Sequence, residues 1–136
     1  SQPTFSPDGN AIAFAVTEEK SRWAGAARVR LAKPTGEVVA TLAETPDSKP
    51  TIVGFTQDGR RVLISETHRT VSRLSALPVD GTFPQDLSPA DEMVVGPSLN
   101  ATRTHVAFVG EDPSRPPEAF ATALPAFSPQ QVSRVQ

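Results

Sequence analysis

Near its start the sequence reads Phe5-Ser6-Pro7-Asp8-Gly9-Asn10-Ala11-Ile12-Ala13-Phe14. Its Asp-Gly pair stands between two apolar runs, which is a strong local signal for a β-hairpin. Glycine adopts a positive φ without steric penalty, and an aspartate side chain can accept hydrogen bonds within its own turn. The run after the turn is short and rich in β-branched and aromatic residues, so we expect a strand there that is buried on both faces.

The same pattern returns twice along the chain. A second copy reads Phe55-Thr56-Gln57-Asp58-Gly59-Arg60-Arg61-Val62-Leu63-Ile64, and a weaker third copy reads Leu99-Asn100-Ala101-Thr102-Arg103-Thr104-His105-Val106-Ala107-Phe108. Thr102-Arg103 occupies the place of Asp-Gly in the third copy. The first two copies are 50 residues apart and the last two are 44 apart. Repeats of about 40 to 50 residues are typical of the four-stranded blades of β-propellers.

Further strands are expected after each copy, in the same order. The buried strands fall at 12–16, 62–65 and 106–109, strands with alternating or apolar character follow at 27–31, 73–79 and 118–124, and outer strands at 37–42, 82–87 and 131–135. The prediction is an all-β fold, a partial β-propeller of about three four-stranded antiparallel blades, at about residues 1–46, 47–92 and 93–136. A β-sandwich with short strands at similar spacing is the alternative. Residues 18–27 are expected to form a loop or a single turn.

Composition narrows the classes of function. The chain has 136 residues, 14 prolines, no cysteine and a net charge of −2. Because proline removes a backbone donor and clashes with the preceding turn, long helices are not expected. The near-neutral charge argues against nucleic-acid binding, and no run approaches the roughly 18 apolar residues that a membrane span needs. The absence of cysteine excludes disulfides, thiolate zinc sites and cysteine nucleophiles.

The first copy of the repeat resembles the TolB-type propeller repeat, in which an aromatic-Ser-Pro-Asp-Gly box precedes an Ile-Ala-Phe strand. A later region is similar to the late propeller of the prolyl oligopeptidase family of serine peptidases, in its acylaminoacyl-peptidase and dipeptidyl-peptidase-like branch. That region comprises Val106-Ala107-Phe108-Val109, Pro113-Ser114-Arg115-Pro116-Pro117-Glu118-Ala119-Phe120 and Gln131-Val132-Ser133-Arg134-Val135-Gln136. Two departures weaken assignment to one subfamily: the missing third Asp-Gly, and Ala119-Phe120 where a Val/Leu-Tyr pair is usual.

The resemblance implies a specific division of labour. In that family the catalytic Ser, Asp and His lie on an α/β-hydrolase domain, and the propeller caps that domain and filters access by peptide size. The implied partners are the hydrolase domain of a parent chain and peptide substrates, with no cofactor. Because the chain starts at Ser1 without Met, we expect it to be a segment of a longer polypeptide that lacks the catalytic domain. We expect a cytoplasmic protein, with a periplasmic or secreted parent as the alternative.

A direct search of the residues predicts no catalytic, cofactor-binding or metal site. The Gly-x-Ser-x-Gly elbow of such hydrolases does not occur in the sequence. His105 is expected to be a packed or hydrogen-bonded residue of the third buried strand, and two separated histidines do not make a zinc site. Asp86, Asp91 and Glu92 are expected to form a solvated acidic loop, because they lack the pattern of a calcium loop.

Four residues are candidates for contacts with a substrate or with another domain: His68, Arg69, Arg115 and Glu118. Arg115 and Glu118 flank Pro116-Pro117, which we expect to hold a loop extended and to lower the entropy lost on ordering it; the alternative is a surface ion pair worth ~0–1 kcal/mol. His68 is expected in a loop, either solvated or near a peptide path. The pairs Arg60-Arg61 and His68-Arg69 could together face a peptide carboxylate, or form a solvated edge.

The turn motif itself consists of Ser6, Pro7, Asp8, Gly9, Asp58 and Gly59. Trp23 is expected to be a packing anchor rather than a platform for a ligand.

Two main hypotheses for the function remain: an inert propeller segment of a serine oligopeptidase, or a non-enzymatic TolB-like module for binding or scaffolding. A stand-alone β domain is a third. Three blades are fewer than the roughly four to eight that close a propeller. We therefore expect two exposed apolar faces and self-association, for instance as a two-fold pair with six blades.

Overall fold

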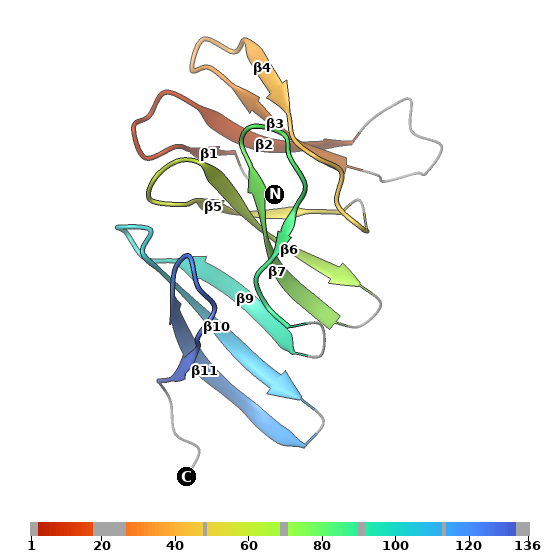
Figure 1. Cartoon of the computed structure of the whole chain (residues 1–136), viewed down its shortest axis with the longest axis vertical. Coiled ribbons are helices and arrows are strands. Elements are labelled where there is room, and N and C mark those ends of the chain that lie inside the picture. Colours follow the sequence, from red (N-terminus) through yellow and green to blue (C-terminus); the bar gives the residue numbers. More distant parts are fainter. Residues whose placement is uncertain are drawn as a thin grey trace.

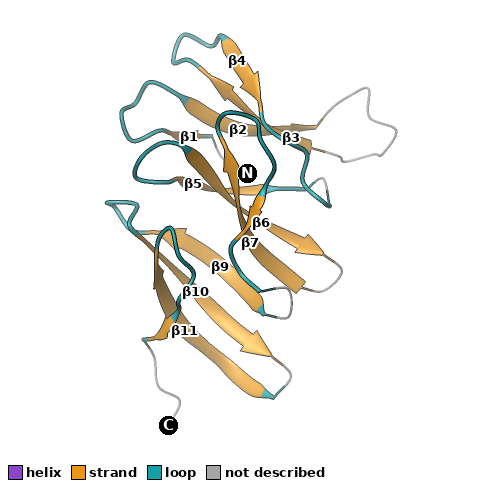
Figure 2. Ribbon diagram, in the orientation of Figure 1, coloured by secondary structure: helices purple, strands orange, loops and turns teal. Residues whose placement is uncertain are grey.

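The computed structural model describes residues 3–17, 27–47, 49–68, 71–89, 92–112 and 114–132. They form three four-stranded antiparallel sheets, each a meander whose strands follow in chain order (Figures 1 and 2). Blade 1 comprises β1 (Thr4–Phe5), β2 (Ile12–Thr17), β3 (Ala27–Ala32) and β4 (Val38–Thr41). Blade 2 comprises β5 (Thr51–Phe55), β6 (Arg61–His68), β7 (Val71–Pro78) and β8 (Gln85–Asp86). Blade 3 comprises β9 (Met93–Leu99), β10 (His105–Asp112), β11 (Arg115–Ala123) and β12 (Gln130–Gln131).

The predicted all-β fold is confirmed, because the described residues contain no helix and three sheets rather than the two of a sandwich. The loop or single turn expected at residues 18–27 lies outside the described residues except for Ala27, which begins β3.

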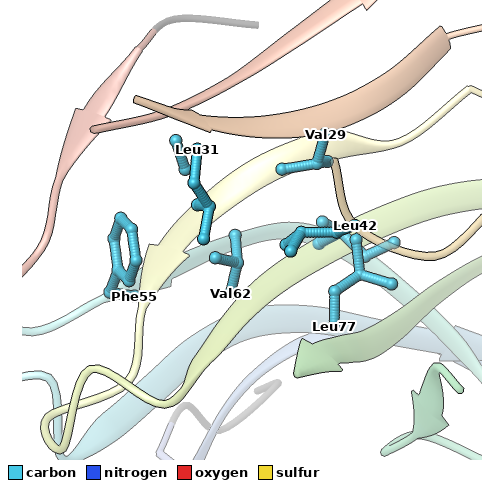
Figure 3. Packing of buried hydrophobic residues seen from close by; sticks show 8 residues of the cluster. Val29, Leu31, Leu42, Phe55, Val62 and Leu77 are labelled. Carbon is cyan, nitrogen blue, oxygen red and sulfur yellow. The ribbon is translucent and has the colours of Figure 1, made fainter. Parts of the chain in front are cut away.

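The three sheets are stacked with blade 2 in the middle, and two hydrophobic layers join them (Figure 1). The layer between blades 1 and 2 contains Ala13, Val29, Leu31, Leu42, Phe55, Val62, Ile64 and Leu77 (Figure 3). The layer between blades 2 and 3 contains Leu63, Leu74, Ala76, Val94, Val106 and Phe108. Successive side chains of a strand point to opposite faces, so Val62 and Ile64 of β6 face blade 1 while Leu63 faces blade 3.

The expectation that the second strand of each blade is buried on both faces holds for β6 and is wrong for β2 and β10. Strand β2 buries Ala13 and leaves its neighbours Ile12 and Phe14 partly exposed. Strand β10 buries Val106 and Phe108, whereas Val109 on its other face is 38% exposed. The physical reason is position: blade 2 has a neighbour on each side, whereas each of the other two blades has one neighbour in this chain.

Two expectations about the edges of the blades are also wrong. The outer strands β8 and β12 are much shorter than predicted, with two residues each, and residues 133–136 lie outside the described part of the chain. Arg115, Pro116 and Pro117 belong to β11 instead of a loop, and Glu118 lies in that strand as predicted. Among the described residues β12 pairs only with Phe120 and Ala121, so the described ladder on this side of β11 does not reach the prolines, which would interrupt it.

The first strands of the three blades adjoin: β5 lies between β1 and β9 (Figure 1). The approach is tight at Gly54, where a Cβ atom would lie 2.7 Å from Cδ1 of Leu99 on β9. The φ of Gly54 is +151°, a conformation that favours glycine. A backbone without a side chain at this position therefore allows β5 and β9 to meet along the inner side of the stack.

Candidate functional site: the blade turns and the grooves between them

The first two Asp-Gly turns are built on one hydrogen-bonding plan. In blade 1, Oδ1 of Asp8 accepts hydrogen bonds from the Ser6 hydroxyl (2.7 Å) and from the backbone N–H of Asn10 (2.9 Å). In blade 2, Oδ1 of Asp58 accepts the equivalent bonds from the Thr56 hydroxyl (2.6 Å) and the Arg60 N–H (3.0 Å). The glycine that follows each aspartate has a positive φ, +74° and +71°. The turn function expected for this motif is therefore visible in its hydrogen bonds.

These hydrogen bonds stabilise the carboxylate form of both aspartates. The Ser6 hydroxyl, and after it the Asn10 N–H, lower the pKa of Asp8 below its ordinary value of 3.8. The Thr56 hydroxyl and then the Arg60 N–H lower the pKa of Asp58 in the same way, with a further contribution from the charges of Arg60 and Arg61. Both aspartates are therefore ionised at neutral pH.

The third turn keeps this backbone plan without the Asp-Gly pair. Oδ1 of Asn100 accepts hydrogen bonds from the backbone N–H groups of Thr104 and His105, both at 2.9 Å. Arg103 stands at the glycine position with a φ of +58°. The weak third copy of the repeat is therefore a true turn of the same kind, in which Asn100 stands at the position of Ser6 and Thr56 and its amide oxygen accepts the backbone N–H groups.

A groove of about 400 Å³ lies between the turns of blades 1 and 2. Its apolar lining includes Leu31, Ala40, Phe55 and Val79, and Asp8 and Asp58 from the two turns line it as well. A volume of this size falls within the range of small-ligand pockets, roughly 300–1,000 Å³. Chemically, the groove can receive an apolar group that ends in a cation or a hydrogen-bond donor.

The corresponding groove between blades 2 and 3 is smaller, about 270 Å³, and its lining includes arginines as well as an aspartate. Arg61 and Arg103 line it together with Asp58, and Leu124 and Pro125 form an apolar wall. Nη2 of Arg103 also donates a weak hydrogen bond to the carbonyl of Phe5 on β1, at 3.4 Å. In the sequence Arg103 is marked only by its departure from Asp-Gly, and nothing local identifies it as a groove residue.

Three of the four predicted contact residues, His68, Arg115 and Glu118, lie on strands away from these grooves. His68 is the last residue of β6 and pairs with Val71, so its placement in a loop is wrong. Arg115 begins β11 in the next blade, where it pairs with Asp112, and Glu118 pairs with Gly110 farther along β11. Arg69 lies outside the described residues. Thus His68 and Arg115 belong to hairpins at the same end of neighbouring blades, opposite the Asp-Gly turns (Figure 1).

A single cationic patch that joins Arg60-Arg61 to His68 is excluded by the strand between them. Arg61 begins β6 and His68 ends it. At about 3.3 Å per residue their backbones are roughly 23 Å apart. The sequence could not show this, because it does not display how far a strand extends before the chain turns.

The remaining residues singled out by sequence do not gather into a site. His105 is the first residue of β10 and is exposed; Nδ1 of its ring is 2.8 Å from the Thr104 hydroxyl, so it is a hydrogen-bonded but not a packed strand residue. Asp86 lies in β8 and Glu92 just before β9, while Asp91 and Trp23 lie outside the described residues. In the described ranges, no group of three metal-ligating side chains converges, and no helix has the length and apolar character to span a membrane.

No protein-family model and no curated protein sequence matches the chain. Solved structures do resemble it. TolB from Acinetobacter baumannii superposes with a TM-score of 0.71 at 16% identity over 96% of this chain and 31% of that one. A structure described as TolB from Agrobacterium tumefaciens gives 0.69 at 16% identity, covering 96% and 45%. A puromycin hydrolase gives 0.63 at 15% identity, covering 97% and 21%.

These similarities concern the fold. They confirm the predicted partial β-propeller with TolB-like blades, and they include both TolB and a puromycin hydrolase among the neighbours. The chain spans less than half of the length of each of these proteins.

Proposed function

We propose that this chain supplies blades of an accessory β-propeller that admits small peptides to a serine peptidase active site of the prolyl oligopeptidase type, and that the chain alone has no peptidase activity. The observation that carries the proposal is the meeting of β1, β5 and β9 on one side of the stack. In a closed ring of blades, such first strands border the axial opening through which a peptide would pass. The similarity in fold to a puromycin hydrolase supports a peptidase parent of the acylaminoacyl-peptidase-like kind.

The walls of such an opening would discriminate by size rather than by sequence. The Gly54–Leu99 contact brings two first strands together with little room for movement. A rigid opening excludes folded proteins and admits extended peptides, which protects other proteins from the peptidase. The contribution of this chain to function is then steric, and peptides bind it weakly.

A second candidate is a non-enzymatic module of the TolB kind, favoured by a specific observation. The groove between blades 1 and 2 combines an apolar floor with two ionised aspartates. A partner segment that carries an apolar side chain next to a lysine or arginine would complement it. This function would require tight binding at the turns rather than weak passage along the first strands.

Titration of the isotopically labelled chain with extended peptides of increasing length, followed by NMR, tests the proposal. Passage predicts weak binding without sequence preference and perturbed signals on β1, β5 and β9. Saturable, tight binding with perturbed signals at Asp8, Asp58 and Phe55 would instead support the module of the TolB kind. Peptides that perturb neither region contradict both functions.

An activity assay provides a separate test. The chain alone should not hydrolyse aminoacyl arylamide substrates above the rate of buffer, and hydrolysis by the purified chain would overturn the proposed role. A phosphonate probe that labels serine nucleophiles gives a second readout, because the chain should remain unlabelled.

A further inference from the structure

The two ends of the blade stack are open sheet faces with apolar character. On the outer face of blade 1, Ile12 and Phe14 lie beside their cross-strand partners Ala32 and Arg30. Phe5, opposite Ile12, is 55% exposed. On the outer face of blade 3, a stripe of small apolar residues is uncovered: Val95, Ala107, Val109, Ala119 and Ala121. In a monomer, both faces would remain in contact with water.

The internal interfaces show which kind of face each open face should meet. The repeat aligns Ile12 and Phe14 with Val62 and Ile64 of blade 2, which pack against the preceding blade. The outer face of blade 1 therefore corresponds to the face by which blade 2 packs against the blade before it.

Blade 3 presents the complementary kind. The repeat aligns Ala107 with Ala13 and Leu63, each of which packs against the blade that follows it. The outer face of blade 3 therefore corresponds to the faces of blades 1 and 2 that pack against the blade after them. The two open faces are thus complementary in the same way as the faces at the two internal interfaces.

The charges on the two faces have opposite signs. Arg30 lies on the outer face of blade 1, where it pairs with Phe14 across the sheet. Arg28 on the same strand lies 3.9 Å from the carboxylate of Glu44, so Arg30 carries the positive charge of this argument. Nε of Arg30 is buried and makes no hydrogen bond among the described residues. Glu111 of β10 lies on the same face as Val109, on the outer side of blade 3. Opposite charges on two apposed faces favour one register of contact over others.

We propose that two copies of this chain assemble head to tail, with the outer face of blade 3 of each copy packed against the outer face of blade 1 of the other. Two copies of three sheets make a six-bladed ring, which falls within the roughly four to eight blades of closed propellers. A two-fold axis along the ring generates both new interfaces at once. The inference rests on the packing of the blades and not on the peptide-gating function, so either can fail alone.

Size-exclusion chromatography with light scattering tests the assembly. We expect a species of twice the 14.4 kDa of one chain over a wide range of concentration. A monomer at every concentration overturns the proposal, and so does a polymer that grows without limit, because its blades would stack without closing the ring.

Two variants disrupt one face each and allow a test by complementation. Phe14→Arg alters the outer face of blade 1 and Val109→Arg that of blade 3, and each should raise the dimer dissociation constant by roughly tenfold or more. A mixture of the two variants retains one intact pair of faces, so it should form a heterodimer that neither variant forms with itself. A mixture that remains monomeric contradicts the head-to-tail arrangement.

Controls keep this test valid if a variant is unstable. Phe83 is 88% exposed in the turn between β7 and β8, away from both open faces, and Phe83→Arg should leave the dimer unchanged. Arg30→Glu removes charge complementarity without placing a charge on an apolar position, and it should weaken the dimer several-fold. Circular dichroism of each variant establishes that the strands are intact. A dimer that is insensitive to both Val109→Arg and Arg30→Glu overturns the proposal.

Discussion

The carboxylate of Glu66, on the second strand of blade 2, accepts a hydrogen bond from the hydroxyl of Thr45, in the segment that links blade 1 to blade 2. The same carboxylate accepts the backbone N–H groups of Asp47 (3.1 Å) and Lys49 (3.0 Å). Glu66 is only 7% exposed, so its lone pairs depend on these donors instead of water. One buried side chain thus ties the interblade segment to the sheet that follows it.

Substitution Glu66→Gln should therefore lower the free energy of unfolding by about 1–3 kcal/mol. The amide replaces an acceptor oxygen with an NH₂ group that faces other donors, which leaves buried groups unsatisfied. Urea denaturation at a fixed protein concentration measures the change. Glu37→Gln is the matched control: Glu37 pairs with Lys33 at 3.4 Å on the surface, and its loss should cost ~0–1 kcal/mol. Equal denaturation midpoints for the two variants would contradict the role of Glu66.

Substitution Gly54→Ala should destabilise the contact between β5 and β9. The added methyl group would lie 2.7 Å from Cδ1 of Leu99, closer than carbon atoms can approach. We expect a loss of about 1–3 kcal/mol from overpacking, in addition to the cost of a positive φ. Gly36→Ala separates the two effects, because Gly36 also has a positive φ (+96°) but nothing lies within 4 Å of its Cβ position. Similar losses in the two variants would show that the close approach carries no energy of its own.

The parts of this fold that could be predicted are those written in local sequence. Asp-Gly between apolar runs indicated the turns, and the alternation of Val29 and Leu31 with arginines indicated β3, whose two apolar residues are buried. The repeat length indicated the blades. These signals are short-range, so they survive in a single sequence.

The parts that could not be predicted depend on neighbours in space. The exposure of Val109 follows from the absence of a covering blade among the described residues, and Pro116 lies in β11 beyond the described ladder with β12. The grooves between blades join residues from separate turns, such as Asp8 and Asp58, and neither turn alone predicts a cavity. The position of His68 was misjudged because nothing local in the sequence marks where β6 ends.

Acidic pH should destabilise the protein through its turns, and Asp58 provides a direct test. The pKa of Asp58 is lower in the folded state than its ordinary value of 3.8, first because of the Thr56 hydroxyl and then the Arg60 N–H. The stabilisation is therefore present above the ordinary pKa and is lost as the pH falls through the lowered pKa of the folded state.

Asp58→Asn should flatten the decline of the unfolding free energy on the acid side, because an amide cannot be protonated in this range. The turn itself should persist, since the third turn has no aspartate and still keeps the backbone hydrogen bond that joins Gly59 to Thr56 in the second turn, there between Arg103 and Asn100. Thr56→Val removes the hydroxyl that contributes most to the lowered pKa, and it should flatten the same curve in part. Urea denaturation at a series of pH values measures all three proteins; parallel curves for Asp58→Asn and the unaltered chain would refute the linkage.

Arg103 occupies a backbone position that favours glycine, and its replacement should measure the free-energy cost of that conformation. Its φ is +58°, where the first two turns have glycines at +74° and +71°. A left-handed conformation costs a residue with a side chain about 1–2 kcal/mol, and glycine avoids this cost. Glycine also raises the conformational entropy of the unfolded state, which offsets part of the stabilisation. Arg103→Gly should therefore raise the unfolding free energy by about 0.5–1 kcal/mol.

Arg103→Ala completes this test, because alanine keeps the conformational cost and loses the hydrogen bond from Nη2 to the carbonyl of Phe5. Thermal unfolding should rank the glycine variant first, the unaltered protein second, and the alanine variant equal to the unaltered protein or below it. The glycine variant also lacks the guanidinium that lines the groove between blades 2 and 3, so its gain in stability cannot come from a new contact there. If the glycine variant unfolds at a lower temperature than the unaltered protein, the hydrogen bond to β1 outweighs backbone strain, and Arg103 holds its turn against blade 1. A glycine variant less stable than the alanine variant would contradict backbone strain at this position, because both variants lack that hydrogen bond.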